Sequence, residues 1–256
     1  MIRQFALVAI YTRRAFLEWM GFRSFLATIV LNQAVTPLLA LAIWSAALPD
    51  QSSISTYFIA LLAVQLMTVS QEYYSVTMRI YDGALSEDLL RPHPFVIAPL
   101  GECIAFRSWN FLMGLPIVLL AMSVAGVSFR AVDIVVAVPA LALAAVLRFL
   151  FVYMLALSAL WVEQAGAVTD LGGTLIFLLG GVAVPMMLFP DRFRILTEAL
   201  PFRAMLGFPA EIASGSLNST QILQGYCWQL LWVTISVPLA MLVWRSGVRR
   251  FTAVGG

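Results

Sequence analysis

Residues 133–163 read DIVVAVPALALAAVLRFLFVYMLALSALWVE, and this stretch decides the fold class. Between Asp133 and Glu163 the only charged residue is Arg148. A helix needs about 20 predominantly apolar residues to cross the roughly 30 Å of hydrocarbon in a bilayer. The stretch is longer than that and almost free of charge, so it predicts a transmembrane helix.

The composition of the rest of the chain agrees with this interpretation. Of its 256 residues, 62% are hydrophobic and 11% are charged, and the mean hydropathy is +0.94. Soluble domains are roughly 45–50% apolar and about 25% charged. A water-soluble globule of this size could not bury so much apolar surface, and a disordered chain would be poor in hydrophobic residues. The sequence therefore predicts an all-α membrane protein.

The gaps between charged residues give six candidate spans. We expect them at 24–48, 56–78, 107–129, 133–162, 170–189 and 224–244. An even number of spans puts both termini on one side of the membrane. The arginines on that side are Arg3, Arg13, Arg14, Arg23, Arg79, Arg91, Arg107, Arg245, Arg249 and Arg250, and those on the other side are Arg130, Arg192, Arg194 and Arg203. Because cytoplasmic segments carry the excess of positive charge, both termini are expected in the cytoplasm.

Two further segments are amphipathic and too polar to span. Residues 1–21 form an expected interfacial helix at the cytoplasmic face. Residues 190–216 form an expected outer loop, in which Pro190, Pro201 and Pro209 divide the chain into one or two short interfacial or re-entrant helices.

Several kinds of chemistry are excluded. All 15 basic residues are arginine, so the chain lacks the phosphate-binding lysine of a P-loop and any ATP must be hydrolysed by another chain. Cys103, Cys227 and the single histidine, His93, have no metal-binding spacing. The net charge of +2 and the absence of a basic face argue against nucleic-acid binding. No reaction centre is visible, so the chain is expected to be neither an enzyme nor a cofactor carrier.

The cytoplasmic loop at 79–106 contains a predicted short helix. Ser86 is expected to cap it, Glu87 and Asp88 suit the positive end of its dipole, and Pro92 ends it. Its apolar surface consists of Leu85, Leu89 and Leu90. An exposed apolar patch of this kind indicates a protein partner, although the leucines could instead lie on the membrane interface.

Five polar residues within the expected spans are candidates for a translocation path. Glu72 and Arg148 are ionisable, and such groups inside a membrane usually face a cavity or a partner. They could therefore contact substrate or form a structural pair. The amides are Asn32, Gln33 and Gln65, which face either the path or a neighbouring helix.

At this point the sequence resembles a known family. Its loop resembles the Gly-x-Leu…Leu-Leu-Arg-Pro-Leu-x-Pro loop of bacterial ABC-2 type permeases, through Gly83, Leu85, Leu89, Leu90, Arg91, Pro92 and Pro94. His93 departs from that pattern, since an aliphatic residue is expected there. Further similarities follow in order: Trp161, Phe189-Pro190, Leu200-Pro201-Phe202, Pro209, Gly215, the tail Trp244-Arg245-Ser246-Gly247-Val248-Arg249-Arg250-Phe251, and Gly255-Gly256.

The resemblance implies a permease subunit of an ABC exporter, similar to the viologen- and drug-exporter group, in a bacterial cytoplasmic (inner) membrane. It implies two copies of a separate ATPase, which hold ATP and Mg, and a second permease that is related or identical. The ATPase-coupling residues would be Gly83, Leu85, Leu89, Leu90, Arg91 and Pro92. The substrate would be an amphipathic small molecule, drug or lipid. The alternative is an ion-coupled secondary transporter, which should show charged relays within spans and an internal repeat.

Overall fold

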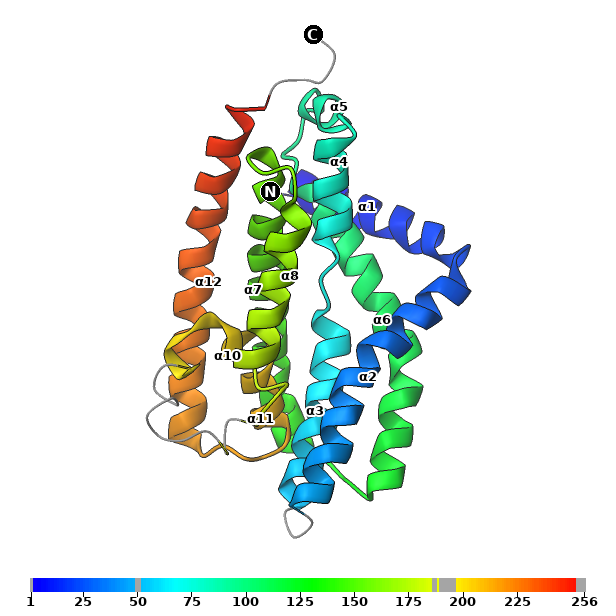
Figure 1. The fold of residues 1–256 in the computed structure, drawn as a ribbon, viewed down its shortest axis with the longest axis vertical. Helices are drawn as coiled ribbons and strands as arrows, with labels where there is room; N and C mark the ends of the chain where they lie inside the picture. Colours follow the sequence, from blue (N-terminus) through cyan, green and yellow to red (C-terminus); the bar gives the residue numbers. More distant parts are fainter. Residues whose placement is uncertain (1, 49–51, 186–187, 189–196, 252–256) are drawn as a thin grey trace.

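The computed structural model describes residues 2–48, 52–185, 188 and 197–251, and its regular elements are helices (Figure 1). No strand occurs in these residues. The prediction of an all-α membrane protein is confirmed. The long helices stand side by side, and the apolar surface that most of them turn outward is the surface that lipid would cover.

Five helices are long and apolar enough to cross a membrane in the described part of the chain. Four of them are continuous: α2 (Arg23–Ala47), α6 (Ile97–Ala125), α7 (Ala131–Ala156, extended by a 3₁₀ turn at Leu157–Leu160) and α12 (Ser219–Val248). The fifth runs from Ser53 to Tyr81 and is interrupted. Each continuous helix contains one proline beyond its first turn, and α6 has a second, Pro99, in its first turn. A bundle tolerates the interior prolines because neighbouring groups satisfy the backbone around them.

Two expected spans differ from the helices that occupy them. The span expected at 107–129 is α6, which begins at Ile97 and therefore contains Arg107 well inside the helix. The span expected at 170–189 is α8 (Ala165–Leu179), a helix of 15 residues that rises only about 22 Å. This is shorter than the hydrocarbon thickness of about 30 Å. Residues 186–187 and 189 lie outside the described part, so α8 is described only as a short apolar helix.

The N-terminal helix α1 (Ile2–Met20) packs against α6. The Phe16 and Trp109 rings stack with their centroids 4.7 Å apart, and Trp109 Nε1 donates to the Phe16 carbonyl at 3.0 Å. The two helices cross closely at Gly101, where an added Cβ would lie 2.6 Å from Tyr11 Cβ. Within the helix expected at 1–21, Phe16 and Trp19 thus pack against α6, whereas Phe5, Ala9 and Met20 are exposed.

The outer segment folds into the bundle. Within it, α10 (Pro201–Met205) and α11 (Gly207–Ala213) contact α7, and every residue of α11 is buried. Their charges are paired, because Arg203 Nη2 lies 2.5 Å from Glu211 Oε2. The described residues of the segment expected at 190–216, which begin at Thr197, therefore pack into the bundle, and their re-entrant position on the outer side stays a prediction. Phe189, Pro190, Arg192 and Arg194 lie outside the described residues.

Candidate functional site

The second spanning helix is broken near its middle. The helix α3 (Ser52–Thr68) ends before a non-helical stretch at 69–71, and a π-helical turn (Tyr73–Thr77) then leads into α4 (Met78–Tyr81), as the cyan trace in Figure 1 shows. In hydrocarbon, broken backbone persists only where protein or a water-filled cavity satisfies its polar groups. The interruption is therefore a candidate functional site.

Arg107 satisfies the carbonyl groups that the break exposes. Its Nε donates to the Val69 carbonyl at 2.8 Å, and its Nη2 donates to the Thr68 carbonyl at 3.2 Å and to Ser70 Oγ at 3.1 Å. A guanidinium at the carboxyl end of α3 also complements the negative pole of that helix. The sequence predicts Arg107 at the cytoplasmic end of the span at 107–129. This prediction is wrong in that Arg107 lies inside α6, ten residues after its first residue, Ile97.

Arg148 approaches the same break from α7. Its Nη1 donates to Thr68 Oγ1 at 3.0 Å, and Thr68 Oγ1 in turn donates to the Val64 carbonyl at 2.8 Å. Arg148 Nε is buried without a hydrogen-bond partner. Arg107 and Arg148 thus both bind groups at the end of α3 or in the break that follows it.

Glu72 begins the second half of the broken helix and is 1% exposed. Neither of its carboxylate oxygens has a hydrogen-bond partner, and no ion pair joins it to Arg148 in the described structure. The possibility of a direct structural pair between Glu72 and Arg148 is therefore wrong for this conformation. The Cys103 thiol and the Arg107 and Arg148 guanidiniums interact with the charge of Glu72, but no nitrogen or oxygen donor of the described residues binds its oxygens, so the carboxylate can still accept from a ligand or from water.

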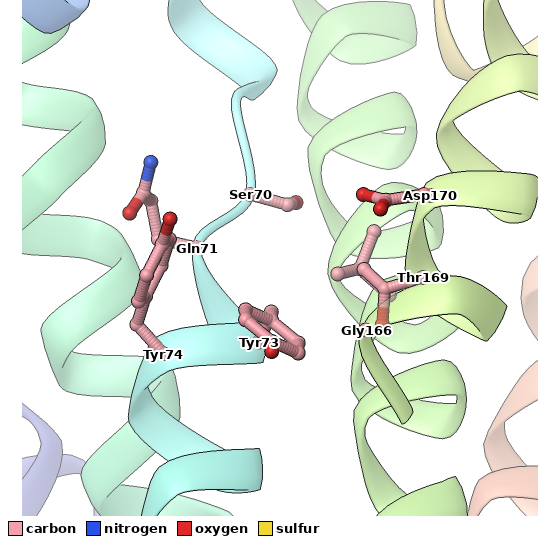
Figure 2. Close-up of a pocket in the computed structure, with 8 residues that line it drawn as sticks. Ser70, Gln71, Tyr73, Tyr74, Gly166, Thr169 and Asp170 are labelled. Atoms are coloured by element: carbon pink, nitrogen blue, oxygen red, sulfur yellow. The ribbon is translucent and has the colours of Figure 1, made fainter. Parts of the chain in front are cut away.

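A cavity of about 350 Å³ lies between the break and α8 (Figure 2). The residues that line it are Ser70, Gln71, Tyr73, Tyr74, Val152, Gly166, Thr169 and Asp170. The Tyr73 and Tyr74 rings meet edge to face, with centroids 5.2 Å apart. The volume falls within the range of roughly 300–1,000 Å³ that small-molecule pockets occupy. Sequence reasoning missed these residues, although the polar run Ser70-Gln71-Glu72 inside an apolar span was a signal for them.

The three amides proposed for the path do not gather at this cavity. Gln65 Nε2 donates to the Gln33 carbonyl at 3.3 Å, which joins α3 to α2. Asn32 is exposed on α2. None of the three lines the cavity. The structure therefore places Gln33 and Gln65 in a helix–helix contact and brings only the residues around Glu72 to the break.

The loop at 79–106 contains the expected short helix, α5 (Leu85–Leu89). The helix begins one residue before Ser86, and no side chain caps it, so the prediction of a Ser86 cap is wrong. Gly83, which precedes α5, has a φ of 77°, a conformation that favours glycine. Pro92 follows α5 in non-helical backbone.

The three leucines of the loop do not share one surface. Leu85 is completely buried in a cluster with Val76, Ile80 and Phe95, whereas Leu90 is 87% exposed and Leu89 is 41% exposed. Leu85 therefore belongs to the core, which corrects the expected three-leucine patch. What remains for a partner is the pair Leu89 and Leu90.

A network of charges fixes α5 to its surroundings. Asp88 is buried and accepts from Arg79 Nη1 at 3.1 Å and lies 3.2 Å from Arg91 Nη1. Arg79 also pairs with Glu102 on α6. Arg91 Nη1 donates to the Tyr11 hydroxyl at 3.2 Å, and this hydrogen bond raises the pKa of Arg91. Arg91 therefore binds partners within the chain, and α5 is held rigidly.

Comparison with known proteins agrees with the resemblance. A family model described as ABC-2 family transporter protein matches residues 23–255. A search of the curated proteins finds no match. The matched region includes the broken span, the α5 loop and all five long apolar helices. The chain therefore belongs to the ABC-2 family of transporters.

Proposed function

We propose that the chain is the transmembrane permease subunit of an ABC exporter in a bacterial inner membrane, with both termini in the cytoplasm. Two copies of a separate ATPase, which bind ATP and Mg, would drive it, and a second permease of the same or a related sequence would complete the path. Membership of the ABC-2 family and the absence of lysine from the chain support this division of labour.

The observation that carries the proposal is the construction of the α5 loop. Leu89 and Leu90 are exposed, while Leu85 and the ion pairs of Asp88 fix the helix that presents them. A rigid element is needed if closure of an ATPase dimer is to move the spans. Burying one leucine contributes roughly 1.5–3 kcal/mol, so two exposed leucines suit an apolar cleft in such a partner.

The broken helix links this loop to the proposed path. α4 and the π-helical turn lie between α5 and the break, so a displacement of α5 would reach residues 69–72 first. Glu72 lies at this point, and its chain neighbours Gln71 and Tyr73 line the cavity. We therefore propose that the path of an amphipathic small molecule, drug or lipid runs beside the break. Asp170 is the charged residue that lines the cavity there, and Glu72 and Arg148 are the buried charged groups at the break itself.

The direct test is co-purification with the ATPase encoded beside this gene, followed by nucleotide hydrolysis in lipid in the presence of a panel of amphipathic compounds. Formation of a stable complex whose hydrolysis rises with one class of compound is the expected result. A chain that is inserted and folded but binds no ATPase would contradict the proposal.

A second candidate, an ion-coupled secondary transporter, is favoured by one observation. Discontinuous spanning helices and unpartnered intramembrane carboxylates such as Glu72 are found at ion-coupling sites. Uptake into vesicles that contain this chain without any ATPase, driven only by an ion gradient and abolished by Glu72→Gln, would support this candidate. Uptake that requires ATP and the ATPase would exclude it.

A further inference from the structure

The N-terminal helix α1 is connected directly to the α5 loop. The Tyr11 hydroxyl lies 3.2 Å from Arg91 Nη1 and 3.0 Å from His93 Nε2, and the Tyr11 and His93 rings meet edge to face. The close crossing at Gly101 holds the Tyr11 backbone against α6. A change in the position of α1 would therefore reach Arg91, which is also bound to Asp88 of α5.

The opposite face of α1 is uncovered. Ile10, Arg13, Leu17 and Met20 follow the i, i+3, i+7 and i+10 spacing of a single helix face, and all four are exposed. Arg14 is exposed beside them. In the described part of the chain, neither Arg13 nor Arg14 forms an ion pair or side-chain hydrogen bond. Glu18 is the only acidic residue of α1.

The residues on the exposed face of α1 fit one kind of ligand. Apolar side chains interleaved with arginines, on a helix that lies near the end of a transmembrane bundle, suit the boundary between acyl chains and headgroups. On this side of α1, Arg13 has no ion pair among the described residues, and Arg14 has only the longer-range charge of Glu102; phosphate headgroups carrying a net negative charge would supply direct counter-charges to both. The charge of the face is thus complementary to anionic lipid.

We propose that the exposed face of α1 binds anionic phospholipid headgroups through Arg13 and Arg14, and that Tyr11 transmits this binding to the α5 loop. The lipid would hold α1 in place, and the Tyr11 hydroxyl would then restrain Arg91 and His93. Binding of lipid and restraint of the loop are properties of this chain alone. They can therefore fail or succeed independently of the proposed partnership with an ATPase.

The binding step is tested by titrating short-chain phosphatidylglycerol, with phosphatidylcholine of the same acyl length as the neutral probe, into the detergent-solubilised full chain. The wild type should prefer phosphatidylglycerol, and Arg13→Gln with Arg14→Gln should reduce that affinity by about 25-fold, since each arginine near an anionic surface contributes about a factor of 5. Arg249→Gln with Arg250→Gln removes the same charge from the end of α12 and is the matched control. Equal losses in both double variants, or no preference in the wild type, would overturn the proposal.

The transmission step is tested by hydrogen exchange at residues 85–93, in nanodiscs of phosphatidylcholine or of an equal mixture with phosphatidylglycerol. Exchange should be slower in the mixture for the wild type. Tyr11→Phe keeps the Cβ that packs at Gly101 and removes the hydroxyl, so it should abolish this difference while phosphatidylglycerol binding is retained. A difference that persists in Tyr11→Phe would contradict a role for the hydroxyl.

Discussion

Single residues within the bundle explain why the second span can be broken at all. Three donor contacts from Arg107 satisfy Thr68, Val69 and Ser70, and without them two carbonyl groups would be left in an apolar environment. The break in the second span is thus stabilised by a residue of another helix, α6. Residues 69–71 contain neither glycine nor proline, so no helix-breaking residue marks the interruption, and the polar run that begins at Ser70 is its only local signal.

Arg107→Gln tests this account. The shorter amide cannot reproduce all three contacts, so the free energy of unfolding in mixed micelles should fall by about 2–4 kcal/mol. Arg130→Gln is the matched control, because its ion pair with Asp133 is exposed, and its loss should cost less than about 1 kcal/mol. Equal stabilities of the two variants would show that the break does not depend on Arg107.

Substitutions of the loop leucines should distinguish a leucine that stabilises the fold from one that is free to bind a partner. Leu85→Ala leaves a hole in the cluster around Ile80 and Phe95 and should lower the free energy of unfolding by about 2–5 kcal/mol. Leu90→Ala removes an exposed side chain and should change it by no more than about 0.5 kcal/mol. Denaturation of both variants in the same micelles checks the difference, and similar losses would contradict the assignment of Leu85 to the core.

Sequence reasoning at the residue scale succeeded and failed for identifiable reasons. It found Glu72 and Arg148 because charges inside apolar stretches stand out. It misplaced Arg107 because charges were used to delimit spans, and a guanidinium that binds backbone carbonyls inside a helix violates that rule. It grouped Leu85 with Leu89 and Leu90 because spacing alone does not show which side of a five-residue helix packs against the core.

At the scale of elements, the crossing of α1 and α6 depends on one glycine. A Cβ at Gly101 would lie 2.6 Å from Tyr11 Cβ and 3.0 Å from the Thr12 backbone nitrogen, so Gly101→Ala should push α1 away and cost about 1–3 kcal/mol. Faster hydrogen exchange across residues 8–16 would report the displacement.

Gly173 is the matched control for that substitution. Nothing lies within 4 Å of a Cβ added there, so Gly173→Ala on α8 should stabilise the helix by up to about 1 kcal/mol and leave α1 unchanged. If Gly101→Ala behaved like Gly173→Ala, the close crossing would not be what holds α1.

The approximate positions of the long helices were predictable from the lengths of the apolar stretches, whereas the residues at which helices end or are interrupted were not. Five of the expected spans are occupied by long apolar helices, because lipid requires about 20 apolar residues whatever the fold. α8 is shorter than the expected fifth span, since the chain turns at Gly180 and Gly181, where Tyr57 donates to the Gly181 carbonyl at 2.9 Å. The charges of Arg203 and Glu211 led the sequence analysis to predict that this segment lies at a surface. The two side chains pair with each other, and this pairing allows α11 to be buried.

At the scale of the whole molecule, the α5 loop and the start of α12 lie at opposite ends (Figure 1). With Cys103 and Cys227 replaced, Leu90→Cys and Thr220→Cys place single thiols at exposed positions at the two ends. In intact cells, an impermeant maleimide should label Thr220→Cys, and Leu90→Cys should react only after permeabilisation. The reverse pattern would contradict the proposed cytoplasmic position of α5.

The central claim is that α5 couples this chain to an ATPase, and the most direct measurement uses Leu89→Ser combined with Leu90→Ser. The variant should insert and fold normally, because neither side chain belongs to the core, but it should lose co-purification with the ATPase and ATP-driven transport in reconstituted vesicles. Leu223→Ser, an exposed leucine at the opposite end of the molecule, should retain both. A double variant that binds its ATPase and transports like the wild type would show that α5 is not the coupling element.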